Sequence, residues 1–303
     1  MADLSTKVGA LRLGNPAILA SGISDVTAEL MLAAIDGGAA AVVTKSIGLK
    51  PREGHKNPTV VELENGVLNA MGLPNPGISI YSKEISKVAD AGGKVIASVF
   101  GKNATEFSFL AKKVQAAGAC AVELNLSCPH AKGYGAELGS DPEIVREITS
   151  AVKRSVKIPV FPKLTPNVAD IAGLAKAAER GGADAVVAIN TVKAMKIDPW
   201  VAMPVLSNRI GGYSGPAIRP IGVRCVYEIA GAVKIPVIGA GGITNGSDAL
   251  EYIMAGACAV QIGTAVGPAG TNVFGTVCAE LEAFMDARGY RNIKAMVGKA
   301  RCA

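Results

Sequence analysis

Hydrophobic residues recur along the chain in short continuous runs, not in alternation with polar residues. Four runs share one phrase, in which a glycine-containing turn precedes an apolar stretch: residues 37–45, 117–125, 181–190 and 255–264. Four further runs complete the set, two of them containing Lys-Ile-Pro-Val: residues 157–163, 234–240, 93–99 and 16–21. Continuous apolar strands are typical of a parallel sheet that is buried on both faces.

Helical patterns fill the gaps between these eight runs, for example at 106–116, 142–155, 170–180, 247–255 and 273–287. Eight strands alternating with helices predict an α/β fold, a (β/α)8 TIM barrel with long βα loops over its C-terminal face. We expect a single domain over residues 1–303. The alternative is an open doubly wound sheet, but no G-x-G-x-x-G follows the first run and the repeat continues to the C-terminal part of the chain.

Two of the predicted βα loops are long, covering residues 46–92 and 191–215, and the last part of the first has a helical pattern. Long connections in a compact domain are usually functional or disordered. Because these two carry glycines and prolines that specify defined turns, we expect them to take part in function.

Composition narrows the class of protein. Half of the 303 residues are hydrophobic, which is enough to bury a large core. The net charge is +6, but the basic residues are scattered along the chain, which argues against a nucleic-acid partner. The sequence shows neither a secretory signal pattern nor an apolar run long enough for a membrane span, so we expect no membrane association. Six widely spaced cysteines without any C-x-x-C predict no metal site built by this chain alone, and a cytoplasmic setting.

The chemistry of a barrel gathers at the carboxyl ends of its strands. Strands seven and eight end in Gly241-Gly242 and Gly263-Thr264, where backbone N–H groups can approach an anion. We therefore expect a phosphate-bearing ligand at these residues, with Gly215 as a further donor. The other strand ends carry Ser21, Lys45, Gly101, Asn125, Lys163 and Asn190.

Lysines and asparagines at the strand ends indicate the chemistry of the part of the ligand that is not phosphate. The stems of Lys45 and Lys163 are expected to be buried, and a desolvated lysine needs an anionic partner or a depressed pKa. Schiff-base formation and stabilisation of a reduced cofactor or a carboxylate both remain open. Asn69, Asn125 and Asn190 indicate a planar polar ligand with donors and acceptors.

Cys128 follows strand four in Asn-Leu-Ser-Cys-Pro-His, outside any apolar run. This position argues against a packing role, which stays the alternative, and the residue lacks partners for a metal. A nucleophile or a base is therefore the favoured role. An ordinary thiol has a pKa of about 8.5, so modest tuning suits it to removing a proton near neutral pH.

Taken together, these motifs resemble the dihydroorotate dehydrogenases over nearly the whole chain. The matching segments, in order, are 44–46, 69–77, 125–129, 163–167, 189–191, 211–220, 239–243 and 261–265. The resemblance implies a flavin-containing barrel that oxidises (S)-dihydroorotate to orotate in pyrimidine biosynthesis.

The resemblance also implies roles. Cys128 would remove the C5 proton of dihydroorotate while the C6 hydride passes to N5 of FMN. The substrate residues would be Lys45, Asn69, Met71, Gly72, Leu73, Asn125, Asn190 and Thr191. The residues at FMN would be Ser21, Lys45, Ser46, Asn125, Lys163, Ile189, Gly215, Gly241, Gly242, Gly263 and Thr264.

A cysteine base selects the soluble branch of this family, which contains a fumarate-using homodimer and an NAD-linked type. Residues 135–145 and 189–198 resemble the NAD-linked type. The resemblance then implies a homodimer that joins an electron-transfer subunit carrying FAD and a [2Fe-2S] cluster, forming a heterotetramer. The fumarate-using homodimer is the alternative, and a Schiff-base aldolase or isomerase using Lys45 or Lys163 is a remote one.

Two positions depart from the family pattern. His130 stands where asparagine is usual and either tunes the thiol or faces solvent. Pro162 stands in strand five, where we expect its missing N–H to produce a local irregularity.

Overall fold

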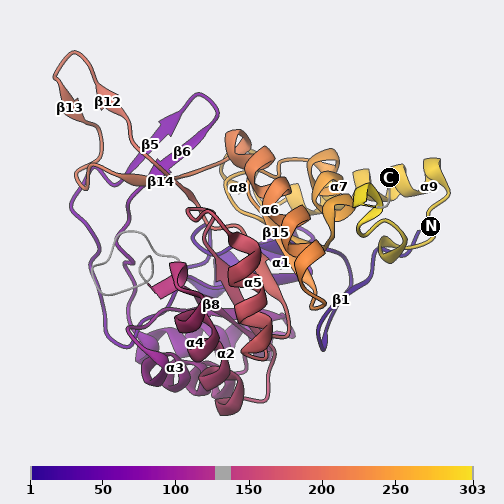
Figure 1. Ribbon diagram of the computed structural model, residues 1–303, viewed down its shortest axis with the longest axis horizontal. Coiled ribbons are helices and arrows are strands. Elements are labelled where there is room, and N and C mark those ends of the chain that lie inside the picture. Colours follow the sequence, from indigo (N-terminus) through magenta and orange to yellow (C-terminus); the bar gives the residue numbers. More distant parts are fainter. Residues whose placement is uncertain (1, 127–137, 302–303) are drawn as a thin grey trace.

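The computed structural model describes residues 2–126 and 138–301. Eight parallel strands close into a barrel in which successive strands along the chain are neighbours (Figure 1). These strands are β3 (Ala17–Leu19), β4 (Ala41–Val43), β7 (Val95–Val99), β8 (Ala121–Asn125), β9 (Val160–Leu164), β10 (Val186–Ala188), β15 (Val237–Ala240) and β16 (Ala257–Ile262). Each coincides with one of the eight apolar runs, with β9 ending one residue beyond its run, so the predicted (β/α)8 barrel is confirmed. The expectation of a single domain stays a prediction.

Helices surround the barrel, and all five helical patterns named above are confirmed. The α-helices are α1 (Ala28–Asp36), α2 (Ile78–Asp90), α3 (Ala104–Ala116), α4 (Pro142–Ser155), α5 (Ile171–Arg180), α6 (Arg219–Ala232), α7 (Gly246–Ala255), α8 (Val266–Ala269) and α9 (Val273–Arg288). Short 3₁₀ turns lie at Leu138–Ser140, Pro216–Ile218, Ile293–Ala295 and Lys299–Arg301. Side chains cap several helix starts. At α3 the Asn103 side-chain oxygen accepts from Glu106 N, and at α4 the Asp141 carboxylate accepts from Glu143 N and Ile144 N.

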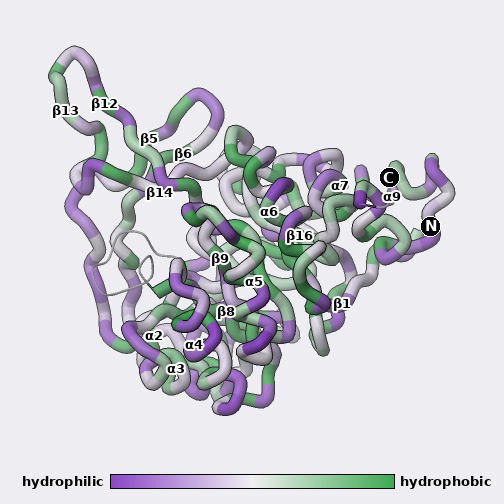
Figure 2. Tube along the Cα trace, viewed as in Figure 1, coloured by the Kyte–Doolittle hydropathy of each residue, from purple (hydrophilic) through white to green (hydrophobic). Residues whose placement is uncertain are grey.

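The apolar residues of each barrel strand divide between two cores. Along β8, Ala121 belongs to the cluster inside the barrel, whereas Val122 and Leu124 pack outward with the helices. This alternation follows from the two-residue period of a strand. Hydrophobic residues accordingly follow the central strands, and hydrophilic ones the outer turns of the helices (Figure 2).

A short antiparallel hairpin packs against the inner core. It is formed by β1 (Thr6–Val8) and β2 (Leu11–Leu13), and its apolar residues Val8, Leu11 and Leu13 join the cluster inside the barrel. The interior is therefore a packed core along most of its length. Among the described residues, the buried polar side chains of Ser98, Glu123, Lys163 and Gln261 lie toward the carboxyl ends of their strands, and these ends carry the site.

The two long loops build a second sheet beside the barrel mouth (Figure 1). Its strands, in order, are β11 (Val192–Ala194), β14 (Gly211–Ser214), β6 (Gly66–Asn69) and β5 (Val60–Leu63). A smaller hairpin of β12 (Ile197–Asp198) and β13 (Met203–Pro204) extends from it, with Trp200 95% exposed at its tip. The sequence patterns predicted functional loops here but not this sheet, because the pairing joins residues about 145 positions apart.

Strand β9 passes through Pro162 in unbroken register with β8, so the expected irregularity is wrong. The carbonyl oxygens of Val160 and Leu164 accept hydrogen bonds on the β10 side, from Asp184 and Asn190. Pro162 shares their direction because strand residues alternate. Its missing N–H therefore faces β10, which pairs with β9 at only two positions.

No helix in the described part of the chain is long and apolar enough to cross a membrane.

Candidate active site

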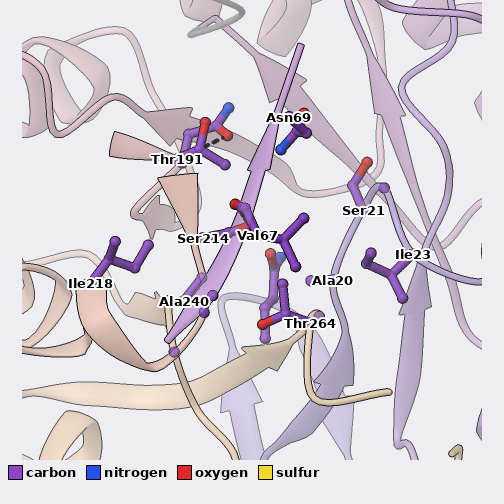
Figure 3. A pocket seen from close by; sticks show the side chains of 18 of the residues that line it. Ala20, Ser21, Ile23, Val67, Asn69, Thr191, Ser214, Ile218, Ala240 and Thr264 are labelled. Carbon is purple, nitrogen blue, oxygen red and sulfur yellow. Dashed lines mark hydrogen bonds between the residues drawn. The ribbon is translucent and has the colours of Figure 1, made fainter. Parts of the chain in front are cut away.

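A cavity of about 900 Å³ opens where the barrel strands end. Figure 3 shows Ala20, Ser21, Ile23 and Thr264 on one side of it and Thr191, Ile218 and Ala240 on the other, with Val67 and Ser214 between them. The candidate site residues that the structure describes all line this cavity: Ser21, Lys45, Ser46, Asn69, Met71, Gly72, Leu73, Asn125, Lys163, Ile189, Asn190, Thr191, Gly215, Gly241, Gly242, Gly263 and Thr264. Cys128 and His130 lie outside the described residues.

Glycines after β15 and β16 form one end of the cavity. Gly242 has φ +69°, and a Cβ added there would lie 2.6 Å from the carbonyl oxygen of Gly215, which itself has φ +106°. Only glycine fits both the conformation and the close approach of these two segments. The backbone here is thus exposed to a ligand without side chains in the way, as a phosphate group requires.

Amide side chains form a hydrogen-bonded chain at the ends of β8 and β10. Asn190 Nδ2 donates to Asn125 Oδ1 over 3.3 Å, and Asn125 Nδ2 donates to Ser46 Oγ over 2.9 Å. The Ser46 hydroxyl also shares a 2.9 Å hydrogen bond with Ser98, and Asn190 Oδ1 accepts from Thr191 N. These contacts fix the side chains before any ligand arrives.

The second sheet contributes the opposite wall. Asn69 ends β6 and lies at the cavity (Figure 3). Its Nδ2 donates to the carbonyl oxygen of Gly212 over 3.3 Å. Met71, Gly72 and Leu73 follow in the same segment, and the carbonyl oxygen of Met71 accepts from His55 N. This sheet therefore carries Asn69 to the same cavity as Asn125 and Asn190.

The two lysines differ in environment. Lys45 is half-buried, whereas Lys163 is only 7% exposed. Lys163 Nζ donates to Gln261 Oε1 over 2.8 Å, and Gln261 Nε2 donates to Glu123 Oε2 over 2.6 Å. Lys163 Nζ also lies 3.6 Å from Glu123 Oε1. The expectation that both stems are buried is met fully by Lys163 and partly by Lys45.

Asp25 adds a buried carboxyl group close to the cavity. It lies in the loop after β3, where its carboxylate accepts from Gly22 N and its carbonyl oxygen accepts from the Tyr81 hydroxyl and from Lys45 N. Burial raises the pKa of Asp25 to about 6, against the opposing attraction of Lys45, the Gly22 hydrogen bond and Lys163. Its backbone contacts tie the Ser21 loop to the start of the Lys45 segment.

Sequence reasoning missed several of these residues. Glu123 and Gln261 each lie within an apolar run. The only sequence feature that could have revealed them was a single polar residue at an inward-facing position of the strand. The β5–β6 hairpin had a clearer sequence signal, since Asn65-Gly66 between apolar residues is a strong hairpin pattern. Asp25 carried no local signal, because its contacts come from distant residues such as Tyr81 of α2, 56 positions away.

The cavity thus offers a glycine-lined end for an anion, a buried cation at its floor and a fixed set of amides. A planar, polar ligand with a phosphate tail, such as a flavin mononucleotide, fits this donor set. Fold and site together define a barrel enzyme with its chemistry at the C-terminal face.

The sequence model for "Dihydroorotate dehydrogenase" matches residues 3–285. The chain belongs to the dihydroorotate dehydrogenase family, whose members are oxidoreductases. It is 53% identical over 300 residues to a protein of Thermoplasma acidophilum, covering 99% of both chains. It is 52% identical over 298 residues to one of Pyrococcus horikoshii, covering 98% of this chain and 97% of that relative. A Methanosarcina mazei protein is 51% identical over 292 residues, covering 96% and 93%. All three relatives are named "Dihydroorotate dehydrogenase B (NAD(+)), catalytic subunit".

Proposed function

We propose that this chain is the catalytic subunit of an NAD-linked dihydroorotate dehydrogenase, which oxidises (S)-dihydroorotate to orotate in pyrimidine biosynthesis. The observation that carries the proposal is one cavity that joins a glycine-lined end, the buried Lys163 and the linked amides of Asn125 and Asn190. Relatives of the same name, matching over nearly their full length, support it further.

The substrate would be held at the amide end of the cavity. Asn69, Asn125 and Asn190 can each donate to ring carbonyl oxygens and accept from ring N–H groups, as a dihydropyrimidine requires. Thr191 and the segment of Met71, Gly72 and Leu73 line the same end. The Lys45 ammonium group would be attracted to the substrate's carboxylate.

FMN would lie along the floor, one molecule per chain. Gly215, Gly241, Gly242, Gly263 and Thr264 would hold its phosphate, and Ser21, Lys45, Ser46, Asn125, Lys163 and Ile189 would line its ring. Backbone N–H groups in the glycine segments suit the phosphate because they donate without side-chain obstruction. When bound, FMN supplies the two-electron acceptor for the hydride that leaves C6 of the substrate.

Cys128 would remove the proton from C5, so that loss of this proton and of the C6 hydride leaves the C5–C6 double bond of orotate. This role follows from the family resemblance, and Cys128 lies outside the described residues. The linked amides of Asn125 and Asn190 would orient the ring so that C5 faces the thiolate, which is where a base gains most of its effect.

A partner subunit would carry the electrons onward. We propose a homodimer of this chain that joins an electron-transfer subunit holding FAD and [2Fe-2S], giving a heterotetramer. The words "catalytic subunit" in the relatives' names support a second subunit. The dispersed cysteines support both a cluster on the partner and a cytoplasmic setting. The reported relatives give no support to the fumarate-using alternative, and membership of an oxidoreductase family argues against the Schiff-base alternative.

The first experiment is an anaerobic visible spectrum of the purified chain, before and after adding dihydroorotate. We expect a flavin band that bleaches with the substrate. A protein that stays colourless after FMN is supplied would exclude the proposed cofactor, and a yellow protein that the substrate fails to bleach would exclude the proposed substrate for the isolated chain. Comparing fumarate with NAD plus the partner subunit as acceptors then tests the subtype.

A further inference from the structure

Three buried side chains from opposite sides of the barrel meet beneath the cavity. Glu123 is on β8 and Lys163 on the neighbouring β9, whereas Gln261 is on β16, across the lumen. Glu123 is fully buried, Gln261 is 2% exposed and Lys163 is 7% exposed. All three line the cavity, so they form its polar floor above the apolar interior.

The chemistry of the three groups dictates how they connect. A lysine ammonium group only donates and a carboxylate only accepts, so the amide between them must turn its oxygen to Lys163 and its nitrogen to Glu123. The structure has this orientation, with 2.8 Å from Lys163 Nζ to Gln261 Oε1 and 2.6 Å from Gln261 Nε2 to Glu123 Oε2. Glu123 Oε1 accepts no hydrogen bond from the described residues and lies 3.6 Å from Lys163 Nζ.

Because Glu123 is buried, its carboxylate has a strong electrostatic effect on the other charged groups of the cavity floor. Charges in a low-dielectric interior interact over several ångströms with little screening. The charged groups around the floor are Lys163 and Lys45, which are cationic, and Glu123 and Asp25, which are carboxyl groups; both lysines act on Asp25 electrostatically. Removing the charge of Glu123 would leave the Lys163 ammonium group without its ion-pair partner.

We propose that Glu123, with Gln261 as its bridge, is a positioning residue that fixes the Lys163 ammonium group at the cavity floor and partly neutralises it, thereby lowering the reduction potential of the bound flavin. This proposal rests on the function proposed above. Lys163 is the group that meets the cofactor. Glu123 acts through Lys163, and Gln261, which reaches both side chains from across the lumen, holds them in place.

The test is the two-electron reduction potential of the FMN-loaded Glu123→Gln protein. The substitution keeps the size of the side chain and its ability to bridge, but removes the negative charge. We expect the oxidised–reduced equilibrium to shift at least tenfold toward the reduced, anionic flavin, which is a rise of about 30 mV for a two-electron couple. An unchanged potential would overturn the proposal.

Asp184→Asn is the matched control. It also removes a carboxylate that is ion-paired to a lysine, with 2.6 Å between Asp184 Oδ2 and Lys153 Nζ. Asp184 precedes β10 and binds the N–H of Val160 at the start of β9, at the end of the barrel opposite the cavity. The potential of Asp184→Asn should equal that of the wild type, and an equal rise in both variants would contradict a local effect of Glu123.

A second variant tests the proposal independently, in case Glu123→Gln fails to fold or to hold FMN. In Gln261→Glu, a protonated carboxyl group can donate to Glu123 and accept from Lys163, as the amide does. We expect the wild-type potential at low pH and a progressive fall below it as the proton leaves with rising pH. A potential that follows the wild type at every pH would overturn the proposal. Bleaching of the wild-type flavin by dihydroorotate tests the function separately, so the two failures are distinguishable.

Discussion

Asn190 and Asn125 are hydrogen-bonded to each other, Nδ2 to Oδ1, over 3.3 Å, although 65 positions separate them in the chain. Asn125 in turn donates to Ser46, so side chains at or just after the ends of three different barrel strands are held as one unit. A prearranged unit loses little side-chain entropy when a ligand binds. This makes Asn125 the central member of the proposed orotate site.

Asn125→Ala should therefore weaken orotate binding more than it weakens the fold. Loss of one well-placed polar group costs about 1–3 kcal/mol, which is a rise in Kd of about 5–150-fold. A titration of the flavin spectrum with orotate measures the change. Asn103→Ala is the control, since it removes the cap of α3 at a cost of about 1 kcal/mol in stability and should leave the Kd for orotate unaltered. Equal Kd values in both variants would argue against the assigned role of Asn125.

Gly242→Ala should lose FMN. Its new Cβ would lie 2.6 Å from the Gly215 carbonyl oxygen and 3.0 Å from the Arg219 Cβ, so one of the two segments must move. We expect at least a tenfold weaker affinity for FMN, measured by flavin fluorescence on adding FMN to the apoprotein. Gly92→Ala, at φ +83° with no atom within 4 Å, imposes similar backbone strain of about 1–2 kcal/mol without crowding. It should bind FMN normally; flavin loss in both variants would point to general destabilisation.

The Asp25 carboxyl group should make the stability of the apoprotein fall as pH rises from about 4 to about 6. Its pKa is raised in the folded state from 3.8 to about 6, so the folded protein binds the proton more tightly than the unfolded chain does. The stabilisation is complete below the unfolded pKa and is lost as pH rises through the folded one. The rise in pKa corresponds to about 3 kcal/mol.

Asp25→Asn should remove this dependence while keeping an oxygen that can accept from Gly22 N. Urea unfolding at several pH values compares the two proteins, and the variant should gain stability relative to the wild type between pH 4 and 6. A constant difference across this range would show that Asp25 does not titrate there.

Cys128→Ala should keep FMN and orotate binding but lose turnover by roughly 10²–10⁴-fold, the contribution expected of a positioned base. Steady-state rates with dihydroorotate, together with the orotate titration, separate the two effects. Cys278→Ala, on the outer helix α9, is the control and should turn over normally. A near-normal rate in Cys128→Ala would exclude this thiol as the base.

The barrel was predictable because its signals are local. Each run is continuously apolar, as a strand buried on both faces must be. Turns that contain glycine mark where most of the runs begin. Once the strands are known, closure of the barrel brings their carboxyl ends together. Gly242, Lys163 and Asn125 could therefore be assigned to one site from their positions at strand ends alone.

Other features depended on contacts that no local pattern contains. The pairing of β6 with β14 makes a sheet from two loops, and it carries Asn69 to the cavity. Asp25 is buried, and its carbonyl oxygen accepts from the hydroxyl of Tyr81, which lies 56 positions away in the chain.

The polar floor is the clearest case. Glu123 and Gln261 are 138 positions apart, and each one by itself is a single polar residue in an apolar strand. The number of strands and the stagger between them decide which inward side chains meet across the lumen, and this geometry exists only in the closed barrel. The sequence by itself determined the strands, the residues at their ends and the family. Only the tertiary structure decided that a buried carboxylate accompanies Lys163, because a charge is paired by distance in space and not by distance along the chain.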